Sequence, residues 1–296
     1  MKRHLVAALV FLVACGSEPP PSPVQLIASS EVENPLAGYL DAFTRETGIP
    51  VDVSWGHSAE HADRLISKSG EPVDVIVTDN VADIWRAADR GALRPIESAA
   101  LETQPPCLRD PDNYWGALGA RSHAVYHHPG VRPNVVSVHD LGNAGFAGRV
   151  CLSSSRLPVN RSLIAYLIEA EGARDAERLV RRWTRNLAQP PFESEQELLD
   201  ALREGLCDYG IASRDESGIA PGVTALVSQP QTLDITAIGV NRHAANAETA
   251  QVLVDWLLRE TVVRFQPAEG SLPPPVHIAG WRDEEARRLA ERAGYR

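Results

Sequence analysis

Hydroxyl, amide and charged side chains recur in this 296-residue chain directly after short apolar runs. Hydroxyls and the N–H groups at a helix start bind anions, carboxylates bind hard cations, and arginines bind carboxylates or phosphates through paired hydrogen bonds. A single residue of this kind commonly does no more than cap a helix, so the prediction of a binding site depends on the whole set. The predicted ligand-binding residues in these loops are Ser30, Glu31, His57, Ser58, Asn80, Ser154, Ser155, Arg156, Ser213 and Arg214.

Alternating strands and helices are expected to position these loops. Apolar runs predict strands at Val24–Ala28, Val51–Trp55 and Val73–Thr78. Helical patterns follow each strand: Pro35–Thr47, a helix opened by Ser58, and a helix capped by Asn80. This alternation predicts a parallel sheet, and ligands commonly bind where the carboxyl ends of such strands meet.

The same alternation continues through the rest of the chain. Further strands are predicted at Ala117–His127, Arg149–Ser153, Asp208–Ala212 and Thr232–Asn241. Further helices are predicted at Leu163–Ala170, Ala176–Leu187, Ser194–Gly205 (with Glu197 completing a capping box), Ala247–Glu260 and Asp283–Ala293. The chain is longer than a single hydrophobic core usually accommodates. The predicted fold is therefore α/β with two lobes, each a mostly parallel sheet flanked by helices, and a ligand cleft between the lobes.

The N-terminus is typical of an export signal. Lys2 and Arg3 precede the apolar run Leu5–Ala14, which is too short to cross about 30 Å of hydrocarbon as a helix. The run ends at Cys15 in a sequence that resembles the lipobox of bacterial lipoproteins, where the cysteine carries the lipid. Prolines in residues 17–23 favour an extended tether. We predict an exported protein, lipid-anchored at Cys15 and facing the periplasm or the cell exterior; an ordinary signal peptide is the alternative.

Composition and motifs argue against several classes of protein. The chain has 29 Lys and Arg against 39 Asp and Glu, a net charge of −10, and no basic block that would indicate nucleic-acid binding. It contains no G-x-S-x-G, H-E-x-x-H, P-loop or G-x-G-x-x-G motif, so no enzymatic activity is predicted. Beyond the N-terminal signal, no stretch of sequence is long and apolar enough to predict a membrane span.

Cysteines and histidines leave further hypotheses open. Cys151 and Cys207 both begin predicted strands of the second lobe, so neighbouring strands would allow a disulfide and leave Cys107 free. The alternative is that the pair stays unbridged. His57 and His61 are four residues apart at a helix start and could share one face, but no further ligands with zinc-site spacing accompany them.

The order and spacing of several short segments indicate a known family. The segments are Leu40–Val51 (LDAFTRETGIPV), Ser58–Glu60, Pro72–Val75, Gly119–Tyr126, Ala147–Val150, Cys207–Ile211 and Leu289–Gly294. Together they resemble the ferric-iron-type solute-binding proteins of bacterial ABC importers, which are class II periplasmic binding proteins. The resemblance covers nearly the whole mature chain. It implies two lobes, joined by crossover strands, that close over a solute and deliver it to a permease driven by an ATPase.

The resemblance also implies a metal site with one clear departure. The family's carboxylate after the third strand falls on Asp79, whereas its two adjacent tyrosines fall on Asp215 and Glu216. An arginine that some members use falls on Arg121, and the family's anion loop falls near Ser154–Arg156. Carboxylates suit hard ions. We therefore predict Asp79, Asp215 and Glu216 as metal ligands, with ferric iron and a synergistic anion as the transported solute and no permanent cofactor.

Other readings of the same residues stay open. Arg121, Arg156 and Arg214 would suit a receptor for an oxyanion, a phosphonate or a small carboxylate. Asp215 and Glu216 would also suit a solvated turn. A sensor domain without a transport role is a third hypothesis. The expected partners of the leading hypothesis are an ABC permease, its ATPase and the solute, with membrane contact through the lipid only, no nucleic acid, and a monomeric state.

The predicted domain boundaries follow from these assignments. Residues 1–14 form the signal peptide and residues 15–23 the lipidated cysteine and tether. Residues 24–140 form the first segment of lobe one, residues 141–231 lobe two, residues 232–280 the return to lobe one, and residues 281–296 a C-terminal helix.

Overall fold

The structure is a computed structural model that describes residues 21–132, 137–214, 220–227, 231–261 and 273–296. The predicted signal peptide, the predicted lipidation site Cys15 and the metal candidates Asp215 and Glu216 lie outside the described residues. The predicted domain boundaries stay a prediction.

The described strands form one sheet in the order β2-β1-β3-β9-β5-β7-β6, with β4 paired to β9 and β8 paired to β5. Pairing is parallel between β1 and β2, β1 and β3, and β6 and β7. The strands are β1 (Val24–Ser29), β2 (Val51–Gly56), β3 (Val75–Thr78), β4 (Leu93–Arg94), β5 (Trp115–His127), β6 (Val150–Leu152), β7 (Tyr209–Arg214), β8 (Thr224–Val227) and β9 (Leu233–Asn241).

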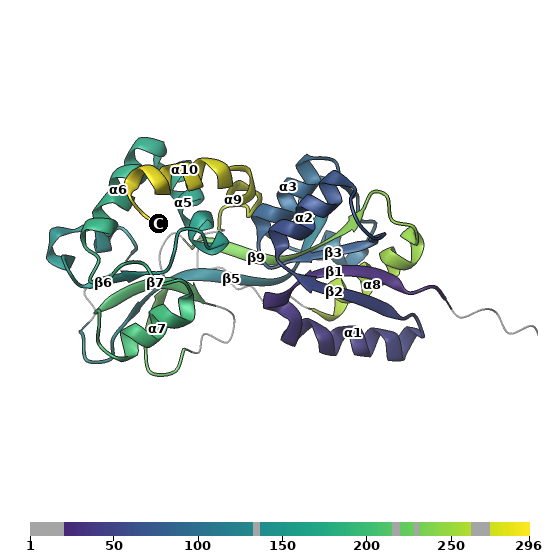
Figure 1. The fold of residues 1–296 in the computed structure, drawn as a ribbon, viewed down its shortest axis with the longest axis horizontal. Helices are drawn as coiled ribbons and strands as arrows, with labels where there is room; N and C mark the ends of the chain where they lie inside the picture. The colour runs from purple at the N-terminus through teal and green to yellow at the C-terminus, as the bar shows by residue number, and fades with distance from the viewer. Residues whose placement is uncertain (1–20, 133–136, 215–219, 228–230, 262–272) are drawn as a thin grey trace, which may run out of the picture.

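Helices cover the sheet in two groups that lie at opposite ends of it (Figure 1). We call β1–β4 with α1–α4 and α8 lobe one, and β6–β8 with α5–α7 and α10 lobe two. The helices are α1 (Glu33–Thr47), α2 (Ser58–Ser67), α3 (Val81–Asp89), α4 (Ala99–Thr103), α5 (Pro158–Glu171), α6 (Ala173–Arg185), α7 (Glu195–Arg203), α8 (Ala247–Glu260), α9 (His277–Trp281) and α10 (Asp283–Ala293).

Two long strands, β5 and β9, run between the lobes and make the two-lobed architecture one continuous sheet (Figure 1). Both run antiparallel to their neighbours: β9 to β3, β5 to β7, and β5 to β9. The sequence predicted a mostly parallel sheet in each lobe, but among the described strands parallel pairing occurs only within β2-β1-β3 and between β6 and β7. The difference arises because a strand that returns from the other lobe enters the sheet in the opposite direction.

Local sequence signals account for several helix ends. The helix α1 ends at Gly48, whose positive φ of 72° suits a left-handed cap. The side chains of Asn80 and Ser194 accept hydrogen bonds from Asp83 N–H and Glu197 N–H, which confirms both as N-caps. The Glu197 carboxylate accepts from the N–H of Glu193 at 3.0 Å, one residue before the position that the predicted capping box requires.

The C-terminal segment holds the two lobes together. The short helix α9 packs against α3 of lobe one and α5 of lobe two, and α10 packs on α5 and α6. Gly280 of α9 lies so close to Trp85 that a Cβ atom would stand 2.5 Å from the Trp85 Cβ. Near the chain end, the Tyr295 hydroxyl donates to the carbonyl of Ser153 at 2.6 Å.

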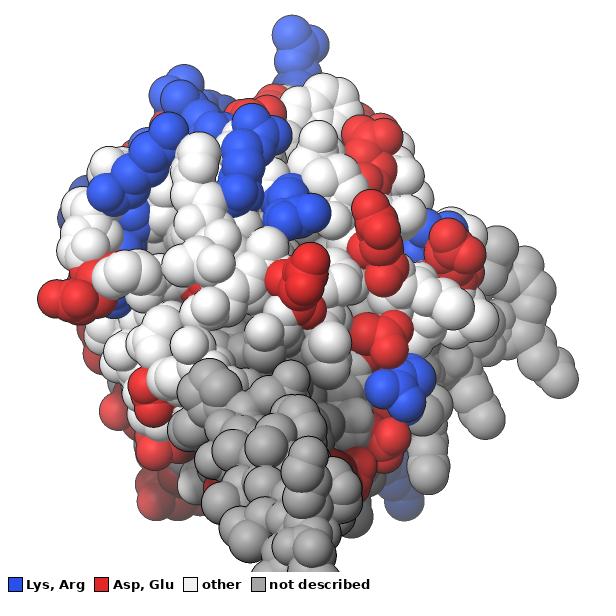
Figure 2. All heavy atoms as spheres, turned by 90° about the vertical axis from the view of Figure 1, so that its right-hand side faces the viewer, with Lys and Arg blue, Asp and Glu red and all other residues white. Residues whose placement is uncertain are grey.

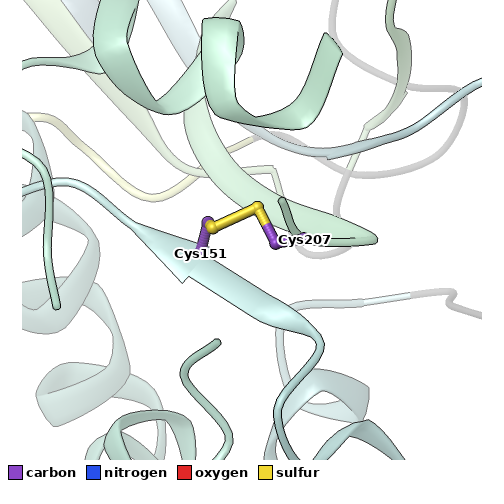
Figure 3. The surroundings of a disulfide bond; sticks show 2 residues. All are labelled: Cys151 and Cys207. Carbon is purple, nitrogen blue, oxygen red and sulfur yellow. A yellow bond between two sulfur atoms is a disulfide. The ribbon is translucent and has the colours of Figure 1, made fainter. Parts of the chain in front are cut away.

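A disulfide joins Cys151 of β6 to Cys207, which lies just before β7 (Figure 3). Their Cα atoms are 5.9 Å apart, and their sequence separation is 56 positions. Cys107 is buried and carries a free thiol. The structure thus confirms the pairing that neighbouring strands predicted.

The described surface gives two further results. Among the described residues, no helix has the length and apolar character needed to cross a membrane. The end of lobe one that faces away from lobe two carries basic and acidic side chains together: blue groups gather toward the top and red groups toward the right and below (Figure 2).

Candidate functional site

A cavity of about 800 Å³ lies between the two lobes and is lined by both. Lobe one contributes the residues after β1, β2 and β3, and lobe two contributes the starts of α5 and α7. The predicted ligand and metal residues that line the cavity are Glu31, His57, Ser58, Asp79, Asn80 and Arg121. The edge of the sheet where the sequence placed the site is therefore the edge that faces the cavity in lobe one.

Asp79 is held by backbone and hydroxyl contacts at the end of β3. The Ser58 hydroxyl, at the start of α2, donates to the Asp79 carboxylate, and the Asp79 N–H donates to the Ser58 hydroxyl oxygen at 3.1 Å. The neighbouring Asn80 caps α3, and its side-chain amide donates to Asp83 at 3.0 Å. These contacts fix the carboxylate of Asp79 at the wall of the cavity.

Arg121 forms the base of the cavity from the crossover strand β5. Its guanidinium donates to the Asp79 carbonyl at 2.6 Å and lies 3.3 Å from the carboxylate of Asp234. The Asp234 side chain is fully buried, and it also accepts the N–H groups of Val81 and Ile235. The Arg121 side chain remains 29% exposed. Arg121 thus joins β5, β9 and the β3–α3 loop, while its side chain remains partly exposed and lines the cavity.

The lobe-two wall contains acidic residues that the sequence analysis did not single out. Glu193, Ser194 and Glu195 line the cavity at the start of α7. The Glu195 carboxylate accepts the N–H of Ser213 at 2.6 Å and also the Ser213 hydroxyl. The sequence marked Ser194 only as a helix cap. The signal that could have found Glu193 is its place just before a capping residue, as Asp79 stands before Asn80.

Other predicted ligand residues do not line this cavity: Ser30, Ser154, Ser155, Arg156, Ser213 and Arg214. Structural contacts explain the serine-rich loop. Ser155 donates its hydroxyl to the carbonyl of Tyr295 at 2.9 Å, and the Asn160 side chain donates to the carbonyl of Ser154 at 2.9 Å. Ser213 is engaged by Glu195. Ser154, Ser155 and Ser213, which the sequence predicted to bind a ligand, thus form hydrogen bonds within the protein.

The charge of the cavity wall is predominantly negative. Six carboxylates line it: Glu31, Glu60, Asp79, Asp83, Glu193 and Glu195. Helix capping explains part of the set, since Glu60, Asp83 and Glu195 lie in first helical turns, where negative charge is favourable. Among the described lining residues, Arg121 is the one Lys or Arg, and its charge is matched by Asp234. No Phe, Tyr or Trp is among them. Such a wall suits a small hard cation better than an anion or an aromatic solute.

The carboxylates do not form a preassembled metal cluster. Among the described residues, no three His, Cys, Asp or Glu side chains are grouped closely enough to hold an ion. His61, the partner of His57 in the zinc hypothesis, is buried, and its Nε2 lies 3.1 Å from the Ala28 carbonyl. Burial lowers the pKa of His61. This contact gives His61 a structural role between α2 and β1.

A second buried histidine, His123, contacts Val159 of the cavity wall and makes the stability of the protein sensitive to acid. The ring of His123 on β5 lies between the Thr232 hydroxyl, 2.8 Å from Nδ1, and the Val159 carbonyl, 2.7 Å from Nε2. Burial lowers the pKa of His123 below its ordinary value. As the pH falls through about 6.5, the unfolded chain takes up the proton before the folded one. The contribution of neutral His123 to stability is therefore complete at neutral pH and is lost on acidification.

We expect the Tm to fall between pH 7 and pH 5, with a smaller fall in His123→Gln. Glutamine keeps an N–H donor for the Val159 carbonyl but cannot titrate. Thermal unfolding of both proteins across this pH range measures the difference. Parallel curves for the two proteins would contradict the assignment of the acid response to His123.

Comparison with known proteins gives consistent results. A sequence profile for bacterial extracellular solute-binding proteins matches residues 24–268. Iron uptake protein A1 of Synechocystis is 29% identical over 258 residues, which are 80% of this chain and 71% of that protein. Among solved structures, Trichodesmium IdiA (FutA) in complex with iron and citrate matches with a TM-score of 0.81 at 26% identity, over 93% of this chain and 100% of the other. The ferric binding protein from Campylobacter jejuni matches with a TM-score of 0.80 at 19% identity, over 92% of this chain and 100% of the other, which is a likeness of fold.

Proposed function

Since the chain belongs to the family of bacterial extracellular solute-binding proteins, we propose that its cleft captures ferric iron, together with an anion such as citrate, for an ABC importer. The family binds solutes, in agreement with the sequence-based expectation that this chain is not an enzyme. The iron assignment is supported by a relative that is named as an iron uptake protein and by a similar structure that holds iron and citrate. The observation that carries it in this chain is the carboxylate-lined cavity between the lobes.

The ligands of the proposed iron site are carboxylates rather than phenolates. All six tyrosines lie in the described part of the chain, and none lines the cavity. Tyr39 lies at the surface of α1, Tyr114 packs against the main core, and four others are buried: Tyr126, Tyr166, Tyr209 and Tyr295. Carboxylate oxygen suits a hard ion without phenolate. We propose Asp79 as a ligand, joined on closure by Asp215 and Glu216, which follow Arg214 in the sequence.

Arg121 is proposed to hold the anion that accompanies the iron. Its guanidinium is anchored on Asp234 and the Asp79 carbonyl but remains partly exposed at the cavity base. An arginine in this state can form paired hydrogen bonds with a carboxylate group. A chelating anion that bridges Arg121 and the iron would complete the coordination of an ion that few protein groups reach.

The cellular setting belongs to the same proposal. We propose that the protein is exported, carried at the membrane by a lipid on Cys15, and that the loaded form docks as a monomer on a permease driven by an ATPase. The family description places its members outside the cytoplasm. The lipobox-like sequence around Cys15 supports the anchor, and metabolic labelling of wild-type and Cys15→Ala protein with a fatty-acid analogue tests it.

The binding proposal is tested by titrating the soluble protein with ferric citrate and by competing the iron away with a chelator. We expect Asp79→Asn to weaken binding at least about tenfold, because outer-shell changes alone commonly cost 10–100-fold. Asp41→Asn, an equal charge change at an exposed site on α1, should bind like the wild type. A wild-type protein that binds no iron under any of these conditions would overturn the proposal.

A further inference from the structure

Glu193 stands out among the acids of the cavity because helix capping does not account for it. It is exposed, lines the cavity and lies before Ser194, the N-cap of α7. The helix already has Glu195 and Glu197 in its first turn to balance its N-terminal charge. Among the described residues, the Glu193 carboxylate has no hydrogen-bond or ion-pair partner, while its N–H donates to Glu197 at 3.0 Å. Its carboxylate is therefore available to a ligand.

The two lobes present the same local arrangement to the cavity. In lobe one, Asp79 precedes the N-cap Asn80, and Asp83 is the third residue of α3. In lobe two, Glu193 precedes the N-cap Ser194, and Glu197 is the third residue of α7. In each case the cap and the first-turn acid satisfy the helix, and the preceding acid is left facing the cavity. Asp79 and Glu193 thus line one cavity from opposite lobes.

Two carboxylates on opposite walls have a defined effect on closure. Their like charges oppose the approach of the lobes when the cavity is empty, and a cation between them makes the approach favourable. A ligand drives closure only by its stronger interaction with the closed state. A cation bound by both walls interacts more strongly with the closed state, because in the open state either wall alone supplies only part of its ligands.

We propose that Glu193 is a ligand that lobe two contributes to the bound cation, opposite Asp79, and that this contact couples binding to closure. The inference rests on the proposed function, since it concerns the same cavity and the same ion. It adds a residue just before α7 that neither the sequence motifs nor the family resemblance identifies.

The test compares Glu193→Gln and Glu193→Asp with Glu204→Gln, a matched charge change at the exposed C-terminal end of the same helix. Iron supplied as ferric citrate is competed against a chelator, and the radius of gyration is measured by small-angle scattering with and without iron. We expect Glu193→Gln to bind at least about tenfold more weakly and to compact less on loading. Glu193→Asp should regain part of the iron affinity and part of the compaction, and Glu204→Gln should match the wild type in both.

The outcomes separate the two proposals. Wild-type affinity together with wild-type compaction in Glu193→Gln would overturn the role of Glu193 and leave iron binding intact. Failure of the wild type to bind iron would overturn both. Because Glu193 is exposed, an unchanged Tm in the variants shows that any loss of binding comes from the site and not from unfolding.

Discussion

Asp234→Ala is expected to destabilise the protein by about 3–5 kcal/mol, the usual cost of breaking a buried ion pair by removing one partner. The change removes the acceptor for the Val81 and Ile235 N–H groups and leaves Arg121 without its countercharge. At about 2–4 °C per kcal/mol, the Tm should fall by roughly 10 °C. Denaturant unfolding or calorimetry measures the loss.

A matched surface pair provides the control for this prediction. Asp175 pairs with Arg178 three residues later on α6, and both side chains are about half exposed. Exposed pairs of this kind contribute about 0–1 kcal/mol, so Asp175→Asn should change stability little. Asp234→Asn, which keeps the size of the side chain, tests the same pair if the alanine variant does not fold. Equal losses in Asp175→Asn and Asp234→Asn would show that burial of the Arg121–Asp234 pair has no special energetic role.

Removal of the disulfide is the second change with a large expected effect. Cys151 and Cys207 are 56 positions apart in the chain, and a crosslink over a loop of that length is worth about 4 kcal/mol in the chain-entropy treatment. Cys151→Ala/Cys207→Ala should therefore lower the Tm by roughly 10 °C. Thermal unfolding of the double variant under non-reducing conditions measures the effect.

Cys107→Ala serves as the comparison because it leaves the disulfide in place. In a soluble form that lacks Cys15, thiol titration of unfolded, unreduced protein should detect only Cys107. Detection of Cys151 and Cys207 as thiols before reduction would contradict the pairing. A double variant as stable as Cys107→Ala would show that the bond forms but does not stabilise the fold.

The sequence was most informative where hydrophobic periodicity and capping agree. The helices Ala247–Glu260 and Asp283–Ala293 have the predicted bounds, and Asn80 and Ser194 cap the helices assigned to them. The predicted start of α5 at Leu163 was late, because the polar residues before it read as a loop, whereas Pro158 begins the helix. Proline at the first position has no N–H to lose and a φ suited to a helix.

More of the residues that line the cavity were predicted from the sequence on lobe one than on lobe two. After three parallel strands, the polar loops must meet at one edge, so Asp79 and its neighbours could be assigned from chain order alone. Chain order did not identify the cavity residues of lobe two in the same way. The serines after β6 contact Tyr295 near the chain end and Asn160 rather than the cavity. The start of α7 reaches the cavity through tertiary packing, which capping signals cannot reveal. Asp234 was missed because it lies inside a predicted strand.

The position of β9 in the sheet determines when each part of the molecule can be completed during folding. β9 is the strand that pairs with β3, yet it lies more than 150 residues further along the chain, and such distant pairing is slow to form. The β5-β7-β6 portion, with its disulfide, needs only residues up to 214. As the chain lengthens from its N-terminus, lobe one therefore begins first, but β3 receives β9 only after the β5-β7-β6 portion of lobe two can pair. Until then the edge of β3 stays unpaired, and an unpaired edge is a site of aggregation that export and refolding must both avoid.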